Sequence, residues 1–339
     1  MLSRRKKYMV WGICILLPIL LLFVSLFVGR YEFEVQDILD ILLHPEEWSS
    51  DPERLIPYSV IYEMRLPRSL LAFVVGAALA ISGGTQQSMF RNPLVDSGML
   101  GVSAGAGFGA CLAIVLFGNN FMIYFMSFGF GILAMGMSYL VGKIYDTSPT
   151  VTLVLGGVVV SSIFSALVSF VKFVADPLEK LPTITFWLMG TLQRANFEDL
   201  GMVLIPIVPS VIVMLLLSWK LNVLSLGEKD AVALGVDVKR IRGILMICTS
   251  IATAAAVCVS GTIGWIGLIV PHIVRMMVGN DNRVLLPASM AIGGAFLMAV
   301  DLLARSITSA ELPIGVLTAI IGGPFFIMIL KRTKGGGSW

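Results

Sequence analysis

WKLNVLSLGEKDAVALGVDVKRIR, residues 219–242, is a charged segment between two long apolar stretches. Residues 228–234 are compatible with a helix, and a glycine stands on either side of them, Gly227 before and Gly235 after. Glycine commonly follows the last residue of a helix, so we expect a short helix that ends at Gly235 and a second that restarts near Val238. Two short helices around a glycine turn form a compact protrusion that suits docking to a soluble partner. The alternative is an ordinary solvated loop, which most charged segments between membrane helices are.

The composition around this segment is that of a membrane protein with many spans. Of the 339 residues, 57% are hydrophobic and 13% are charged, and the mean hydropathy is +0.91. A helix needs about 20 apolar residues to cross a bilayer. The stretches without charged residues that approach or exceed this length are 8–29, 69–90, 97–142, 147–171, 200–219, 243–274, 284–300 and 312–330.

Two of these stretches are long enough for two helices each. Gly118-Asn119-Asn120 interrupts the stretch 97–142, and Ser260-Gly261-Thr262-Ile263-Gly264 interrupts the stretch 243–274. The sequence therefore predicts an all-α integral membrane protein, a bundle of about ten transmembrane helices. The helix after Gly264 is expected to be short or partly re-entrant.

Basic residues at both ends of the chain indicate its orientation. Arg4-Arg5-Lys6-Lys7 precede the first span and Lys331-Arg332-Lys334 surround the end of the last, which favours the cytoplasm for both termini. An even number of spans agrees with this. The threading places residues 219–242 in the cytoplasm and the acidic segment 30–68 outside, where residues 35–43 are expected to form a short interfacial helix. No small-residue cleavage site follows the first apolar stretch, so we interpret it as a retained helix.

Nothing in the sequence indicates an enzyme. The chain has no GxxxxGK[ST] phosphate loop, and its cysteines and histidines have no spacing typical of a metal site. We therefore expect no metal and no cofactor bound by this chain. The predicted spans are nearly free of charged residues, which argues against coupling to protons or sodium. If the chain is a transporter, the energy then has to come from outside the chain, which fits a separate ATPase that uses ATP.

Several blocks resemble one known family in the order in which that family has them. They are Arg65-Leu-Pro-Arg68, FRNPLVDSGMLGVSAG at 90–105, FWLMG at 186–190, GWIGLIVPHIVR at 264–275, DLLAR at 301–305 and ELPIG at 311–315. Together with residues 226–236 they are similar to the permease subunits of ABC importers for iron-siderophores, cobalamin and haem, the FecCD-like type II importers. The resemblance covers nearly the whole chain.

The resemblance implies partners and site residues. Residues 219–242 resemble the family's coupling loop, to which two cytoplasmic ATPase subunits bind, and the name coupling loop is used for them below. The residues expected to contact the ATPase are Leu226, Gly227, Glu228, Ala231, Leu234, Gly235 and Val236. The turn at Thr147, Ser148 and Thr150 resembles a cytoplasmic gate, although Pro149 interrupts it and a plain turn is an equal alternative.

Three arginines fall at the outer face in this threading, against the positive-inside bias. Arg65, Arg68 and Arg305 are expected to form a carboxylate-binding patch, because the planar guanidinium binds a carboxylate through two hydrogen bonds. The resemblance implies that the patch docks glutamates of an extracytoplasmic substrate-binding protein. The alternative is that each arginine anchors a helix at the lipid headgroups.

The expected function is that of one permease domain, residues 1–339, in a bacterial cytoplasmic membrane. It would pair with a second permease subunit, either itself or a close paralogue, contact membrane lipid, bind no nucleic acid, and import a ferric siderophore. Cobalamin and haem are the alternatives within the family. A secondary transporter without an ATPase and a membrane scaffold are the alternatives from other classes.

Overall fold

The computed structural model describes residues 4–29, 31–143, 149–308 and 310–333, and within these ranges the chain is helical and has no strand. The helices that come before the centre of the chain are α1 Arg4–Phe27, α2 Val35–Leu43, α3 Pro45–Ser50, α4 Leu55–Tyr58, the π-helical η1 Ser59–Arg65, α5 Leu66–Phe90, α6 Val102–Leu116, α7 Asn120–Lys143 and α8 Pro149–Val174. The remaining helices are α9 Lys180–Leu188, α10 Phe197–Leu216, α11 Ser218–Leu226, α12 Glu228–Ala233, α13 Val238–Ser260, α14 Ile266–Val278, α15 Asn282–Ile307 and α16 Ile314–Thr333.

The apolar helices correspond to the predicted spans. In the described ranges, seven helical segments are long and apolar enough to cross a membrane, and three shorter apolar helices, α6, α14 and α16, accompany them. The two predicted interruptions are present, since α6 ends at Leu116 before Gly118 and α13 ends at Ser260 before Gly261. Both glycines have positive φ, +70° and +69°, which is why the chain can turn there. The helix after Gly264 is short, as expected, with 13 residues.

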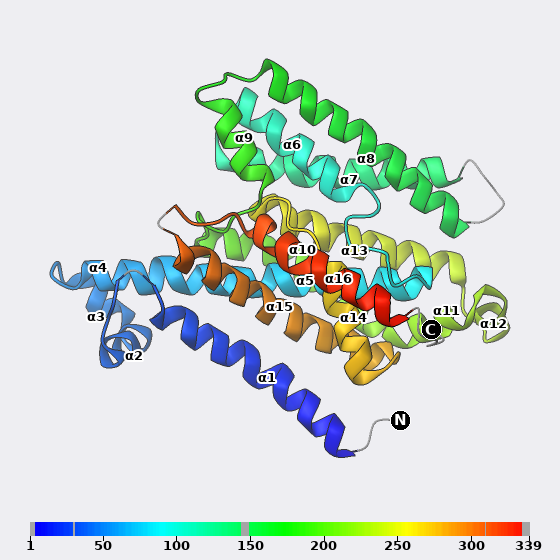
Figure 1. The fold of residues 1–339 in the computed structure, drawn as a ribbon, viewed down its shortest axis with the longest axis horizontal. Helices are drawn as coiled ribbons and strands as arrows, with labels where there is room; N and C mark the ends of the chain where they lie inside the picture. Colours follow the sequence, from blue (N-terminus) through cyan, green and yellow to red (C-terminus); the bar gives the residue numbers. More distant parts are fainter. Residues whose placement is uncertain (1–3, 30, 144–148, 309, 334–339) are drawn as a thin grey trace.

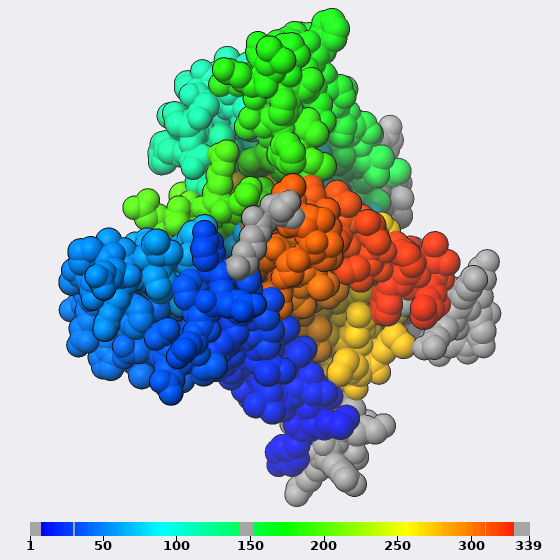
Figure 2. Space-filling view, turned by 60° about the vertical axis from the view of Figure 1, so that its left-hand side comes forward, coloured from blue at the N-terminus to red at the C-terminus, as the bar shows by residue number. Residues whose placement is uncertain are grey.

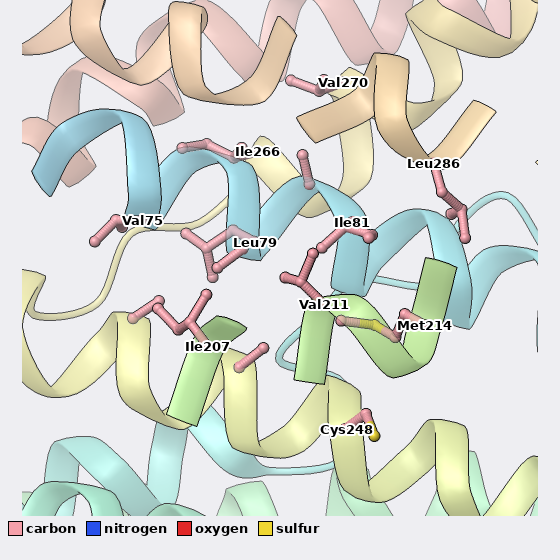
Figure 3. Close-up of a cluster of buried hydrophobic side chains, with 14 of the residues drawn as sticks. Val75, Leu79, Ile81, Ile207, Val211, Met214, Cys248, Ile266, Val270 and Leu286 are labelled. Atoms are coloured by element: carbon pink, nitrogen blue, oxygen red, sulfur yellow. The ribbon is translucent and has the colours of Figure 1, made fainter. Parts of the chain in front are cut away.

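Helix α5 lies at the centre of the bundle. Its leucine, isoleucine and valine side chains pack between α10 on one side and α14 and α15 on another (Figure 3). Twenty of its 25 residues are buried. About 72% of the most apolar window of α5 and of α13 is buried, against 28% for α7, α8 and α10, whose outer faces are left for lipid or for another subunit.

Small residues let the central helices approach closely. A Cβ atom placed on Gly76 of α5 would collide with the backbone oxygen of Gly293 on α15, and one placed on Gly105 of α6 would collide with the backbone of Phe130 on α7. Such small-residue faces bring helix backbones together in lipid. Both contacts lie inside one chain, so these glycines serve bundle packing.

The two ends of the bundle differ. Helices α2, α3, α4 and α9 lie at one end, called here the outer end, while α11, α12, the start of α1 and the last turns of α16 lie at the opposite, inner end (Figure 1). Seen from nearer the outer end, α15 and α16 (orange and red) lie beside the N-terminal helices (blue) and below the green helices α8 and α9 (Figure 2). The predicted short helix at 35–43 is present as α2, and its Ile38 and Ile41 pack with Trp48 and Ile61 into a small core beside the end of α1.

Candidate functional site

The coupling loop projects from the inner end as two short helices, α11 and α12, followed by the long helix α13 (Figure 1). Gly227 separates α11 from α12 with φ of +133°, and Gly235 ends α12 with φ of +77°. The predicted glycine turn at Gly235 is confirmed. The second helix restarts at Val238, as predicted, but it is 23 residues long because it continues directly into the bundle.

Gly235 lies in a Schellman motif, the standard way of ending a helix on a left-handed residue. The Val236 N–H donates to the Ala231 carbonyl at 2.9 Å, and the Gly235 N–H donates to the Val232 carbonyl at 2.9 Å. This motif brings the side chains on either side of the turn together. Ala231 and Val236 accordingly lie in the hydrophobic core of the chain, with exposed fractions of 0% and 7%.

The burial of Ala231 corrects one sequence-based expectation. Ala231 and Val236 were expected to contact the ATPase, but both side chains are buried in this chain's own core. The large apolar side chains of the coupling loop that are exposed are Trp219 at its start, at 52%, and Leu226, Val232 and Leu234 around α12, at about 60% each. Leu226 and Leu234 were predicted as contacts, and Val232 was missed.

Charged groups fix the start of α12. Glu228 accepts a hydrogen bond from the Arg242 guanidinium of α13 at 2.6 Å. Gly227 lies beside the end of α5, because a Cβ placed on it would lie 3.4 Å from the Arg91 guanidinium. The outward-facing leucines and valine are therefore carried on a segment that is tied to α13 and lies against α5.

A second set of contacts ties α11 to the membrane helices, and we call it the Asn222 latch. The Asn222 Oδ1 accepts from the backbone and side-chain nitrogens of Asn282, both at 2.8 Å, and its Nδ2 donates to Asp281 at 2.7 Å. The Asn282 Oδ1 in turn accepts from the hydroxyl of Ser88 on α5 at 2.7 Å. The latch joins the coupling loop to the start of α15 and the inner end of α5.

Asp281 is charged in this latch at neutral pH. Its partial burial raises the pKa of the carboxyl, but hydrogen bonds from Arg283 and Asn222 oppose this and hold the pKa below its ordinary value. Asp281 also begins α15, accepting from the Arg283 backbone N–H at 3.1 Å. Sequence analysis did not single out Asn222, Asp281 or Asn282; the only signal was the polar turn GNDN at 279–282.

At the outer end, the structure brings the three predicted arginines together with two carboxylates, and this group is called the outer arginine cluster. It consists of Arg65, Arg68, Asp301, Arg305 and Glu311. The exposed fractions of Arg65 and Arg305 are 5% and 9%. The three guanidinium groups and two carboxylates leave one positive charge unbalanced.

Arg65 and Arg305 satisfy the end of α1. Arg65 donates to the carbonyl oxygens of Leu26 at 2.6 Å and Tyr31 at 2.8 Å. Arg305 donates to the carbonyl of Ser25 at 2.5 Å and to its hydroxyl at 2.9 Å. The last carbonyls of a helix lack partners within the helix and carry partial negative charge, so two cations at this position cap α1.

Arg68 holds the two carboxylates. Its guanidinium binds Asp301 of α15 at 2.8 and 3.0 Å and Glu311, in the segment before α16, at 3.0 and 3.3 Å. Asp301 is almost fully enclosed, whereas the Glu311 side chain is 23% exposed. Glu311 also has φ of +53°, a left-handed conformation that is uncommon for a residue with a side chain.

The prediction of an open carboxylate-binding patch is therefore wrong for this conformation. Arg65 and Arg305 are buried against carbonyl groups of α1, and the carboxylate-binding edges of Arg68 are occupied by the chain's own Asp301 and Glu311. The physical reason is the high cost of leaving helix-end carbonyls and buried carboxylates without partners. Whether these arginines also dock a binding protein stays a prediction.

The remaining sequence-based site is the cytoplasmic gate. Thr147 and Ser148 lie outside the described residues, as does the side chain of Thr150, so the gate stays a prediction. Pro149 is the first residue of α8, a position at which proline is common because its missing N–H has no partner there. Elsewhere in the described ranges, no three His, Cys, Asp or Glu side chains lie close enough together to hold a metal ion.

Comparisons with known proteins agree with this architecture. The molybdate import system permease protein MolB of Haemophilus influenzae is 41% identical over 336 residues, covering 96% of this chain and 96% of that protein. A protein of Helicobacter pylori strain 26695, named as a permease of an iron chelatin transport system, is 37% identical over 333 residues, covering 97% and 99%. A solved inward-facing structure, assigned to metal-chelate type ABC transporters, has a TM-score of 0.85 and 38% identity and covers 96% of this chain and 99% of its own.

The family is shown by a match along almost the whole sequence. The FecCD transport family matches residues 16–332, a range that includes the coupling loop and every residue of the outer arginine cluster. Proteins with this fold and these relatives are membrane subunits and not enzymes themselves. This chain belongs to the FecCD transport family and is a permease of the ABC importer type.

Proposed function

We propose that this chain imports a ferric siderophore across a bacterial cytoplasmic membrane, driven by two ATPase subunits that bind its coupling loop. We place the ATPase contact at this loop because the side chains of Leu226, Val232 and Leu234 are exposed at the inner end. This end also carries the start of α1 and the last turns of α16 (Figure 1), where basic residues favour the cytoplasm. Apolar side chains that are exposed on an isolated subunit mark surfaces that bind other proteins or lipid.

The substrate is proposed from the relatives and the blocks of the sequence. A permease named for iron chelatin transport, with 37% identity along nearly the full length, supports a ferric chelate. A second candidate is molybdate, which the 41% identity to a molybdate permease favours. Both candidates carry a metal in an anionic or chelated form, so uptake experiments with labelled metal distinguish them directly.

The proposed assembly has two permease subunits, two ATPases and an external binding protein. The exposed faces of α8 and α16 leave apolar area for lipid or for the second permease, with Phe173 of α8 85% exposed and Ile320 of α16 64% exposed. We place both termini in the cytoplasm. Docking of the binding protein through Arg68 would require its glutamate to replace Glu311, the more exposed of the two carboxylates in the outer arginine cluster.

Uptake by reconstituted vesicles tests the proposal. The complete importer, with its ATPase and binding protein, is supplied with ⁵⁵Fe-labelled ferric siderophores, with ⁹⁹Mo-labelled molybdate and with labelled cobalamin in parallel. ATP-dependent accumulation of ⁵⁵Fe, lost in Leu234→Glu, supports the proposal. Accumulation of ⁹⁹Mo alone would replace the siderophore by molybdate, and uptake without any ATPase would remove the proposed energy source.

A further inference from the structure

A cavity of about 370 Å³ opens at the outer end, in the region of α7, α9 and the segment before α16. It has aromatic walls from Tyr124, Phe186 and Trp187, together with aliphatic side chains of α6, α7 and α13. Among the residues that line it, the side chains with hydrogen-bonding groups include Asn120, Thr183, Thr191, Gln193, Arg194 and Glu311. We call it the outer cavity.

The floor of the outer cavity is built by three chain crossings. The Thr191 N–H donates to the Ser260 carbonyl at 2.8 Å, and the Ile314 N–H donates to the Gly190 carbonyl at 3.0 Å. Gly261 passes so close to Trp187 that a Cβ placed on it would collide with the Trp187 carbonyl oxygen. These hydrogen bonds fix the loop 189–191 between α9, α13 and α16, so the cavity is formed before any ligand arrives.

Two charged side chains line the outer cavity, Glu311 and Arg194, and Tyr124 of its wall is hydrogen-bonded to the carboxyl group of Asp199 behind it. Glu311 is neutralised by Arg68, which donates to it at 3.0 and 3.3 Å. Arg194 takes part in none of the ion pairs in the described part of the chain. Its guanidinium donates a hydrogen bond to the side-chain oxygen of Asn120 at 3.3 Å. Arg194 therefore has guanidinium N–H groups free to bind an anion, and a guanidinium binds a carboxylate or a similar pair of oxygens through two hydrogen bonds.

The size and walls of the outer cavity favour an organic ligand over a bare inorganic oxyanion. Sites for small organic ligands have volumes of roughly 300–1,000 Å³, with mostly apolar and aromatic walls and a few placed polar groups. A tetrahedral oxyanion would fill only a small part of this volume and would leave the three aromatic rings without a contact. Three aromatic rings and one cation suit a flat group that carries negatively charged oxygens at one edge.

From this geometry we infer that the outer cavity binds an anionic arm of a ferric chelate, a catecholate or aryl carboxylate, with Arg194 on its oxygens and Tyr124, Phe186 and Trp187 around its ring. This inference rests on the proposed function, because it specifies the chemical class of the substrate. It assigns Arg194 as a binding residue outside the outer arginine cluster.

Equilibrium dialysis of the full chain in lipid nanodiscs tests the inference without any partner. The probes are ⁵⁵Fe-labelled ferric tris(2,3-dihydroxybenzoate) and ⁹⁹Mo-labelled molybdate. We expect the ferric catecholate to bind, Arg194→Gln to weaken its binding about tenfold, and Arg194→Lys to weaken it less, because lysine keeps the charge but loses the paired geometry. Thr183→Trp should abolish binding by filling the cavity. Arg54→Gln, at an exposed arginine of the outer end that lies outside the cavity, should leave the affinity unchanged.

Three outcomes would overturn the inference: no binding of the ferric catecholate by the wild-type chain, equal binding by Arg194→Gln, or Arg194-dependent binding of molybdate in its place. Uptake by the complete importer separates this failure from failure of the proposed function. If ⁵⁵Fe uptake proceeds with the same KM in Arg194→Gln, the importer function stands and the outer cavity is not its binding site.

Discussion

The outer arginine cluster encloses charged side chains that sequence analysis expected to be exposed, whereas the coupling loop leaves apolar side chains exposed, two of which were predicted as ATPase contacts. Arg65 and Arg305 are less than 10% exposed, while Leu226, Val232 and Leu234 are about 60% exposed. The difference follows from the partners available at each end. Helix-end carbonyls and carboxylates surround the arginines, whereas no residue in the described part of the chain covers the leucines and valine. Charge at the end of a membrane helix therefore indicates a possible cap as well as a possible docking site, and exposure distinguishes the two.

The largest expected effect is a loss of stability when the outer arginine cluster is broken. Arg68→Met would leave Asp301 buried without a charged partner of comparable geometry, and removal of one partner from a buried ion pair costs about 3–5 kcal/mol. Thermal and SDS unfolding of the purified chain in micelles measures the loss. Arg54→Met, which breaks the exposed pair with Asp51, should change the stability by less than about 1 kcal/mol.

A second variant checks the cause of that loss. Arg68→Met combined with Asp301→Leu removes both charges of this ion pair and should recover much of the stability, because an apolar pair can replace a buried ion pair and Glu311 keeps contact with solvent. If Arg68→Met alone is as stable as the wild type, the outer arginine cluster is not a buried structural element, and the comparison between the two ends fails.

The next largest effect is expected at the coupling loop of the inner end, where a substitution should change the affinity for the ATPase and leave the stability of the chain unchanged. Leu234→Glu should weaken binding of the ATPase by about 30-fold, about 2 kcal/mol, because it places a carboxylate in an apolar contact. The unfolding of the chain should be unchanged, since Leu234 is exposed in the isolated subunit. Surface plasmon resonance with the subunit in nanodiscs measures the affinity.

Ala231→Glu provides the contrast, because Ala231 is fully enclosed and faces this chain's core. It should lower the stability of the coupling loop, which hydrogen–deuterium exchange of residues 226–237 would report. If the exchange rates of residues 226–237 are the same in Ala231→Glu and in Leu234→Glu, Ala231 faces the partner, as sequence analysis expected.

A smaller effect is expected from the turn that orients the exposed leucines. Gly235→Val should destabilise the coupling loop by about 1–2 kcal/mol, because a β-branched residue fits poorly at φ of +77°. Open space surrounds the glycine, so the cost arises from the backbone and not from a clash. Gly235→Asn is the matched control, since asparagine tolerates the left-handed conformation. From the wild type through Gly235→Asn to Gly235→Val, the hydrogen-exchange rate of the coupling loop should rise and its affinity for the ATPase should fall. If Gly235→Val has the exchange rate and affinity of the wild type, the turn does not orient the exposed leucines.

The smallest effect is the pH dependence of the Asn222 latch. The pKa of Asp281 lies below its ordinary value in the folded chain, so its charged form stabilises the latch above the unfolded pKa of about 3.9. That contribution is lost as the pH falls through the lower, folded pKa. The difference in unfolding free energy between the wild type and Asp281→Asn should therefore be largest at neutral pH and shrink on acidification below about pH 4. A constant difference across this range would show that Asp281 acts only as a hydrogen-bond acceptor.

Local features of the fold were predictable from the sequence because they depend on neighbouring residues. Stretches without charge located the apolar helices, and glycine-containing turns at Gly118, Gly235 and Gly261 located the breaks. The burial of the site residues was not predictable in this way. Arg305 is buried by a carbonyl 280 positions away in the chain, and Ser88 meets Asn282 across 194 positions.

The facing of a short helix was the other limit. Helix α12 has only six residues, too few for an apolar pattern to show which side is covered. The Schellman contact between Ala231 and Val236 decides it, and this contact turns Val232 and Leu234 outward. Sequence analysis located the short helix and its turn at Gly235, but it expected Ala231 to face outward, whereas Ala231 is buried in this chain.

Helix α5 has a mechanical consequence that its composition makes specific. Arg68 near its outer end and Ser88 near its inner end are 20 positions apart, about 30 Å of helix, which is the thickness of the bilayer core. Where α5 meets α15 and α14, Gly76 and Gly83 present backbone rather than side chains, so axial sliding there requires few changes of rotamer. A helix that contacts its neighbours through glycine backbone can shift along its axis as a rigid body. An axial displacement of Arg68 at the outer face would then move Ser88 at the inner face by a similar distance. Because Ser88 donates to Asn282, this movement would change the hydrogen bonds of the Asn222 latch.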